Sequence, residues 1–330
     1  MVSAFLQGSG QSLGGTTIFN FLKYSSAPQI SALGGINVSQ QTKDVSISLG
    51  NPALLGSTMH GQMAANFSSL KDGFKNYQLV GAFRHENLKT NFYGAVNFFD
   101  YGRLIQTDAA GNTLGEFRPN EYVIQVGASR AYGERLNYGA TLKFAHSGYG
   151  NFKASGLAMD VGVSYKDTAS LIQIGLVLSN MGIQTNSFQG AGRENLPFDI
   201  QLGISKRLEK APFQFSLTLH HLHQFDIRYR DSSFDADNGF NQSRNDGIFD
   251  KLFRHCVLST QLFISDKLEI SAGYNYLRRK ELNIGNNGNG LNGFSMGVGI
   301  LVKKIQIRFA RTFYQASFAT NQFGLGLSLQ

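Results

Sequence analysis

The chain has 330 residues, a formal net charge of +8 and only 16% charged residues, which is low for a water-soluble surface. It carries 38 glycines and 27 phenylalanines, yet no run of about 18 apolar residues that would form a membrane-spanning helix. Its lysines and arginines are scattered singly and in pairs, which argues against a nucleic-acid partner. The single Cys256 excludes an intramolecular disulfide framework and a cysteine-rich zinc site. A transmembrane β-barrel accommodates this composition because only alternate residues of its strands face lipid.

The N-terminal part of the chain lacks regular alternation. Residues 1–15 have neither a basic start nor a long apolar core, so we expect a signal-peptide remnant or a disordered N-terminus there. Further on, Asn51-Pro52 favours a turn, and Pro52 cannot donate to a strand ladder. Residues 16–58 are therefore either an ordinary linker before an all-β domain or a plug folded inside a barrel. The rest of the chain decides between these two interpretations.

From residue 60 onward, segments of roughly ten residues carry apolar side chains at alternate positions. In one of them Ile200, Leu202 and Ile204 share a face, and the opposite face is small or polar. A soluble sandwich also alternates, but it does not need so many glycines on its second face, whereas a crowded barrel interior does. Arg311 interrupts the apolar face of its segment, and Arg254 and His255 begin a mixed one. We expect these residues at strand ends, near an interface.

The alternating segments number about fourteen, an even count within the range of outer-membrane barrels. The predicted strands cover residues 60–70, 75–85, 90–102, 120–132, 135–147, 153–166, 169–180, 196–207, 212–224, 252–264, 267–279, 292–302, 304–314 and 320–330.

The connections between these segments alternate in length, and all the long ones fall at every second position. The long ones are residues 103–119, 181–195, 224–251 and 280–291. Short turns at one end and long loops at the other are typical of bacterial outer-membrane barrels. The sequence therefore predicts an all-β fold, a 14-stranded antiparallel transmembrane β-barrel over residues 59–330, with residues 16–58 as an N-terminal hatch or plug. We expect it in the bacterial outer membrane, with both termini periplasmic, the long loops extracellular and lipid around the wall.

The hatch segment resembles a known family. Its motif residues are Leu33, Gly34, Gly35, Asp44, Asn51, Pro52 and Ala53, and the run before them covers residues 15–22. This order resembles the N-terminal hatch of the FadL-like outer-membrane barrels. Within them it is most similar to the PorV/PorQ branch of the type IX secretion system of Bacteroidota.

The resemblance implies a binding role without catalysis. Barrels of this branch belong to a surface attachment complex, in which secreted proteins are processed and linked to lipopolysaccharide. The implied partner is a PorZ-like surface protein, alongside PorU-like and PorV-like components. The contact would fall first to residues 224–251, and second to the loops at 103–119 or 280–291. The candidate contact residues are Arg228, Arg230, Asp231, Phe234, Phe240 and Arg244.

Two other functions stay open at this point. A FadL-like transporter of hydrophobic compounds would show a continuous apolar pocket beside residues 51–55, with a strand kink or a lateral gap. A soluble all-β binding protein would turn a polar face to water and have no aromatic girdle.

Metal and catalytic sites have weak support in the sequence. One polar group consists of His220, His221, His223 and Asp226. Because neighbours on a strand point to opposite faces, we expect that at most His221 and His223 share a ligand. We favour a role for these residues at the membrane interface or the base of the loop. The weak calcium candidates are Asp235, Asp237 and Asp246, which lack a closing glutamate, and a solvated loop is the preferred interpretation. We find no nucleophile elbow or phosphate-binding loop, and expect neither an enzyme nor a cofactor.

Overall fold

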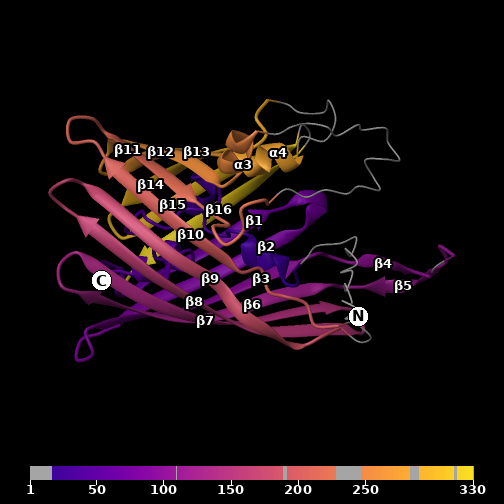
Figure 1. Cartoon of the computed structure of the whole chain (residues 1–330). Helices are drawn as coiled ribbons and strands as arrows, with labels where there is room; N and C mark the ends of the chain where they lie inside the picture. Colours follow the sequence, from indigo (N-terminus) through magenta and orange to yellow (C-terminus); the bar gives the residue numbers. More distant parts are fainter. Residues whose placement is uncertain are drawn as a thin grey trace, which may run out of the picture.

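The computed structural model describes residues 17–108, 110–188, 192–227, 247–282, 290–315 and 318–329. Its strands form a closed antiparallel barrel in the order β1-β16-β15-β14-β13-β12-β11-β10-β9-β8-β7-β6-β3-β2, with β4 and β5 paired separately as a small projecting sheet (Figure 1). The prediction of a 14-stranded antiparallel barrel is confirmed.

The barrel strands are β1 (Gln62–Ser69), β2 (Lys75–His85), β3 (Thr90–Asp100), β6 (Asn120–Tyr132), β7 (Leu136–Tyr149), β8 (Phe152–Asp167), β9 (Ile172–Asn186), β10 (Asp199–Arg207), β11 (Phe213–Leu219), β12 (Cys256–Ser265), β13 (Leu268–Asn275), β14 (Phe294–Val302), β15 (Ile305–Gln315) and β16 (Phe318–Ser328). The small sheet is β4 (Leu104–Thr107) and β5 (Thr113–Phe117). The helices are η1 (Asn20–Lys23), α1 (Pro28–Ala32), η2 (Val45–Leu49), η3 (Pro52–Leu54), η4 (Ser57–Met59), η5 (Lys71–Gly73), α3 (Ile248–Arg254) and α4 (Tyr276–Leu282).

Each predicted strand overlaps one observed barrel strand, and the main differences lie where strands give way to helices. Helix α3 runs to Arg254 and β12 begins at Cys256, so Arg254 and His255 precede the strand that we expected them to begin. Likewise, β11 ends at Leu219, five residues before its predicted end at Gln224, and α4 replaces the predicted end of β13. Arg311 lies four residues before the end of β15 and is exposed, as expected of a residue near an interface.

The apolar face of the strands points outward. Leu202, Ile204 and Phe323 are 39%, 42% and 52% exposed, whereas Gly203 and Ser205 between them on β10 are buried in the interior. A soluble protein would expose the opposite face, so the soluble alternative is wrong. Outward aromatic side chains gather toward both strand ends, as in the aromatic belts of membrane barrels. Examples are Phe83, Tyr132 and Phe213 at one end and Tyr77, Phe98 and Phe152 at the other.

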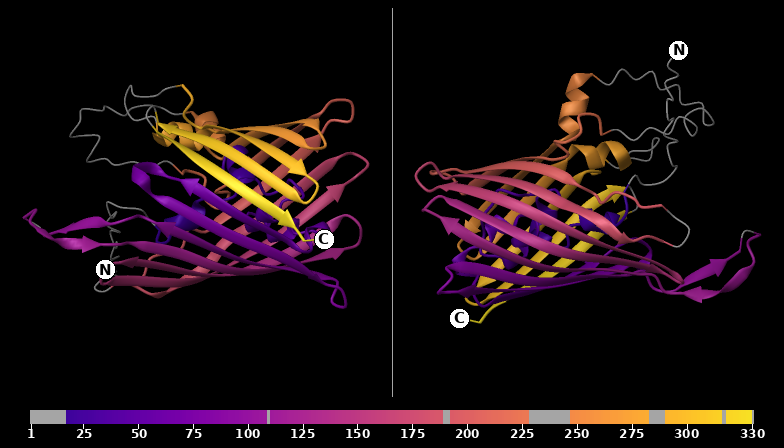
Figure 2. Two further views of the ribbon diagram at one scale, coloured as in Figure 1. Left: turned by 180° about the vertical axis from the view of Figure 1, so that it is seen from behind. Right: turned by 60° about the horizontal axis from the view of Figure 1, so that its bottom comes forward.

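The two ends of the barrel differ, with short turns at one end and all the long connections at the other (Figures 1 and 2). Leu329, the last described residue, lies at the turn end, where its amide donates to the Gly61 carbonyl. The first described residue, Thr17, bridges to Asn195 in a long connection at the opposite end. Residues 1–16 and Gln330 lie outside the described residues, so the expectation that both termini are periplasmic stays a prediction. No described helix is long and apolar enough to span a bilayer.

The segment before β1 lies inside the barrel. It enters beside Asn195 at the loop end and passes through α1. Residues 40–43 border a cavity that is also lined by the short turns around Lys166 and Ser265, so the segment reaches the turn end. It continues through η2 and η3 and joins β1 at the turn end, where Gly61 pairs with Leu329. We call residues 17–61 the hatch.

Candidate functional site

Wall glycines make room for the hatch. A Cβ atom at Gly175 on β9 would overlap the backbone carbonyl of Val38. A Cβ at Gly203 on β10 would lie 3.0 Å from the side chains of Val38 and Ser39. On β14, a Cβ at Gly297 would lie 2.6 Å from that of Ala32. These positions belong to the small inner face recognised in the sequence, and their role is close approach of two backbones.

The Asn51-Pro52-Ala53 motif fixes a turn of the hatch against β7 and β8. Asn51 is fully buried; its Oδ1 accepts from the Ala53 amide at 3.0 Å, and its Nδ2 donates to the Val38 carbonyl at 2.7 Å. This is the N-cap of η3, which Pro52 then starts with a preset φ. The wall has glycine opposite the motif, with Gly139 facing Pro52 and Gly162 facing Asn51.

Gly34 and Gly35 end α1 with left-handed backbone angles of φ 95° and 91°. There is no room for side chains here, because a Cβ at Gly34 would overlap Val257 and one at Gly35 would overlap Arg278. The Gly34 carbonyl accepts from Arg278 Nη2 at 3.1 Å and from Asn275 Nδ2 at 3.3 Å. Leu33 beside them is 2% exposed.

Asp44 joins the hatch to the wall through a buried ion cluster. One carboxylate oxygen accepts from the Ser46 amide at 2.8 Å, capping η2. The other pairs with Arg308 Nε on β15 at 2.9 Å, and the same guanidinium pairs with Glu269 on β13. All three charged side chains are less than a tenth exposed. Two carboxylates therefore share one guanidinium out of water, an arrangement that depends on every member.

The cavity inside the barrel has both apolar and polar lining residues, the apolar ones including Phe21, Ile36 and Val123. A space of about 150 Å³ lies between the hatch and the wall and is lined by Gln78, Asn97 and Gln125, among others. At its edge Lys143 Nζ pairs with Asp160 at 2.6 Å and donates to Asn180 Oδ1 at 2.9 Å. These charged and polar side chains interrupt the apolar ones, so the lining does not provide a continuous apolar path.

The wall has one irregularity next to this cavity. The β8–β9 register shifts between Met159 and Val161, and Asn180 has a left-handed φ of 56°. Its amide donates at 2.7 Å to the Asp160 side chain in place of a backbone carbonyl. The predicted transporter features are therefore met in part. A strand irregularity is present, but the cavity beside it contains buried charges, and it is lined by residues 35–38 and 49–50 and not by residues 51–55.

A second cavity of about 430 Å³ opens at the loop end and is mainly aromatic. Phe99, Tyr101 and Tyr149 line it, and both tyrosine hydroxyls donate to the carboxylate of Glu121, the second at 2.8 Å. The Ser147 hydroxyl also donates to Glu121 at 2.8 Å. This site pairs an apolar surface with one fully hydrogen-bonded acid.

Most of the loop proposed for partner binding lies outside the described residues. Arg228, Arg230, Asp231, Phe234, Phe240 and Arg244, and the calcium candidates Asp235, Asp237 and Asp246, all belong to that part. The described end of this connection is α3, which is tied to α4 because Asp250 accepts from Tyr276 at 2.6 Å and pairs with Arg254 and Lys280. Ile248 and Phe249 of α3 are 69% and 76% exposed.

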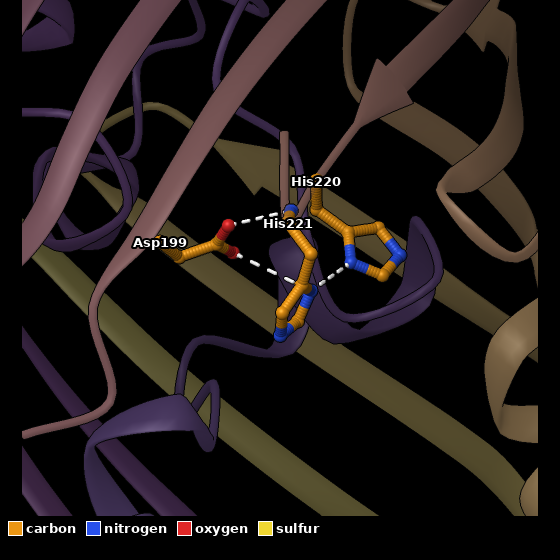
Figure 3. Close-up of side chains that lie close together, drawn as sticks. All are labelled: Asp199, His220 and His221. Atoms are coloured by element: carbon orange, nitrogen blue, oxygen red, sulfur yellow. Dashed lines mark hydrogen bonds and ion pairs between the residues drawn. The ribbon is translucent and has the colours of Figure 1, made fainter. Parts of the chain in front are cut away.

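The histidines lie differently from the prediction (Figure 3). The Nδ1 atoms of His220 and His221 are 2.5 Å apart, whereas His221 and His223 have ring centroids 6.0 Å apart. The premise of that prediction, that neighbouring side chains point to opposite faces, does not hold here, because the strand has ended at Leu219 and His221 has a left-handed φ of 55°. Asp199 at the start of β10 is the third member. Burial, and then the neighbouring imidazoles, lower the pKa of His220 to about 3, which keeps the ring neutral.

Several contacts were missed from the sequence. Arg308 and Glu269 were not linked to Asp44, and Lys143 was not linked to Asp160. A charged residue on the inner, small-residue face of a strand is the signal that would have marked them, since a buried charge needs a partner. Asp226 pairs with Lys251 at 3.1 Å.

No protein-family model matches the sequence, and no curated protein does. Solved structures share its fold. The TodX deltaS2S3 mutant monoaromatic hydrocarbon channel has a TM-score of 0.54 at 12% identity, over 91% of this chain and 96% of that one. The CymD monoaromatic hydrocarbon channel gives 0.51 at 12% identity, over 94% and 97%. A Pseudomonas aeruginosa FadL homologue gives 0.51 at 10% identity, over 93% and 98%. The chain therefore has the fold of the FadL-like outer-membrane barrels.

Proposed function

We propose that the chain is an outer-membrane anchor of a type IX secretion attachment complex, a sealed barrel of the PorV/PorQ branch. It would hold a PorZ-like surface protein together with PorU-like and PorV-like components. The turn end with the described C-terminal residue would be periplasmic, and the long loops extracellular.

The observation that carries this proposal is the polar interlock between hatch and wall along the lumen. Near the loop end, Asn97 donates to Ser26 Oγ at 2.9 Å. At the turn end, the Gln41 amide donates to Gln173 Oε1 at 2.9 Å, close to the Asp44 and Arg308 ion pair. Moving the hatch would break many buried polar contacts at once, and each lost partner leaves a costly unpaired group. A barrel sealed in this way is suited to holding a partner at its surface. The hatch motif, which resembles this branch, supports the same assignment.

The described surface that best suits a protein partner is α3. Its side chains Ile248 and Phe249 are among the most exposed large apolar groups of the chain, and α3 continues the long connection after β11. Exposed aromatic residues on a defined helix are typical anchors of protein interfaces. The Asp250 network with α4 would hold this helix in a fixed position.

The first experiment is a pull-down of the tagged chain from native outer membranes, with mass spectrometry of the bound proteins. We expect a PorZ-like protein with the wild type. We expect its loss to background when Ile248→Ser and Phe249→Ser are combined, and when residues 228–248 are replaced by a short Gly-Ser turn. The matched control is Ile105→Ser on β4, which removes an apolar side chain that is 66% exposed at the same end of the barrel. Absence of any PorZ-like protein from the wild-type sample would refute the anchor.

A second candidate function is transport of small hydrophobic compounds. It is favoured by the aromatic cavity at the loop end, by the β9 irregularity at Asn180, and by the likeness in fold to structures named as monoaromatic hydrocarbon channels. In this case, the purified barrel would carry an apolar ligand. Cells expressing it would also take up labelled toluene faster than cells expressing a variant in which Phe99→Gln narrows the apolar lining. Equal uptake by both would remove the transporter.

A further inference from the structure

Asp199, His220 and His221 come together from two neighbouring strands. Asp199 begins β10, and the two histidines directly follow β11, which pairs with β10 (Figure 3). One carboxylate oxygen and one nitrogen from each ring all lie within 4.8 Å of one another. We propose that these three side chains form a binding site for a divalent transition-metal ion of the zinc or copper class.

The contact between the two imidazoles is the first argument. Their Nδ1 atoms are 2.5 Å apart, which is shorter than the usual N–H···N separation. In a zinc or copper site, two nitrogens each about 2.0–2.1 Å from the ion would be about 3 Å apart. A small rotation of the half-buried His221 ring would supply this change, because that side chain is 26% exposed.

The second argument is the burial of the facing pair. His220 is 1% exposed, and the polar contact of its ring runs from Nδ1 to His221 Nδ1. In a hydrogen bond between two neutral imidazoles one of these nitrogens must donate and the other accept, whereas a bound cation would serve as a common partner for both.

The surroundings fix the ligands in place. Asp199 Oδ1 accepts from the His221 amide at 2.6 Å, and Asp199 Oδ2 accepts from Gln201 Nε2 at 2.8 Å. His255 Nδ1 lies 2.7 Å from the His220 carbonyl. Such outer contacts orient ligands in protein metal sites. Asp199 and His221 also line the internal cavity of about 150 Å³, which leaves space for water at the open coordination positions.

The ligand set decides the class of ion. Two neutral imidazoles with one carboxylate suit zinc, copper or nickel, whereas calcium and magnesium require a shell of oxygen ligands. Lys23 lines the same cavity, and its positive charge opposes any cation there, so the ion must be held by strong ligands. The site would tie the start of β10 to the base of the long connection after β11. It does not rest on the proposed anchoring function.

The test uses the full chain, purified in detergent without a histidine tag and stripped with chelator. We expect isothermal titration with Zn²⁺ to give one saturable site per chain. With Cu²⁺, electron paramagnetic resonance should show hyperfine coupling to two nitrogens. The variant His221→Gln should lose both the saturable Zn²⁺ site and the two-nitrogen copper signal. The outer variant Gln201→Leu should weaken affinity by about 10- to 100-fold.

The matched control is His223→Gln, which removes a nearby imidazole that packs on Phe198 with ring centroids 5.1 Å apart. It should bind Zn²⁺ as the wild type does. Because His220 is buried, its replacement risks misfolding, and the half-buried His221 and the carboxylate variant Asp199→Asn therefore carry the test. No saturable Zn²⁺ binding by the wild type, or equal binding by wild type and His221→Gln, would overturn the proposal.

Discussion

The Gly175→Leu variant is expected to displace the hatch and turn a closed barrel into a conducting one. Position 175 lies on the inner face of β9, where even a Cβ atom would overlap the Val38 carbonyl. A leucine side chain is several atoms larger, and the wall is closed by continuous strand pairing, so the hatch must yield. In planar bilayers we expect the wild type to show no steady channel, and Gly175→Leu to show discrete openings. A 14-stranded barrel without its filling leaves an aqueous lumen.

Two further glycine variants should show a weaker effect on conductance and no effect. At Gly203 the atoms nearest to an added Cβ belong to the side chains of Val38 and Ser39 and lie 3.0 Å away or more, so Gly203→Leu should conduct less often than Gly175→Leu. Gly94→Leu is the matched control, because Gly94 faces outward on β3 and a Cβ there meets nothing within 4 Å. It should remain closed. If all three variants stayed closed while folding normally, the hatch would not be what seals the lumen.

The barrel was predictable because a period of two residues is a local signal. Strand β10 shows this: Leu202 and Ile204 alternate with Gly203 and Ser205, and every such pair separates a lipid-facing side chain from an inner one. The alternation of connection lengths also predicted that the two ends of the barrel differ, with short turns at one end and long loops at the other. Both signals can be read from the sequence without knowing which strands pair.

Helices α3 and α4 were not predictable in this way. The apolar side chains of residues 248–254 fit either a short helix or the start of a strand, since seven residues hold too few repeats to separate the two periods. The predicted strand therefore began at residue 252, four residues before the observed start of β12 at Cys256.

The contacts that make the candidate sites are long-range and are not written in local sequence. Asp44 meets Arg308 only because the hatch passes beside β15, near the opposite end of the chain. The histidine pair depends on the left-handed backbone of His221, an uncommon conformation for a residue with a side chain. Strand geometry places neighbouring side chains on opposite faces, and that rule stops applying where the strand ends.

The Arg308→Met variant is expected to lower the free energy of unfolding by about 3–5 kcal/mol, because it leaves two carboxylates buried without their cation. Asp44 and Glu269 are 7% and 9% exposed at their side chains, so water replaces little of the lost attraction. The measurement is urea unfolding in lipid vesicles, followed by far-ultraviolet circular dichroism and by the heat-dependent gel mobility of the folded barrel. Since Asp44 caps η2 of the hatch, we also expect faster proteolysis of the hatch segment.

The controls separate lost charge pairing from lost packing. Combining Arg308→Met with Asp44→Asn and Glu269→Gln removes all three charges and should recover most of the stability, because neutral side chains of similar shape avoid the cost of unpaired buried ions. Arg311→Met, on the same strand but exposed, should change stability by no more than about 0.5 kcal/mol. Equal losses from Arg308→Met and Arg311→Met would mean that the ion cluster does not hold the hatch. In that case the wall glycines and the buried hydrogen bonds alone would account for its position.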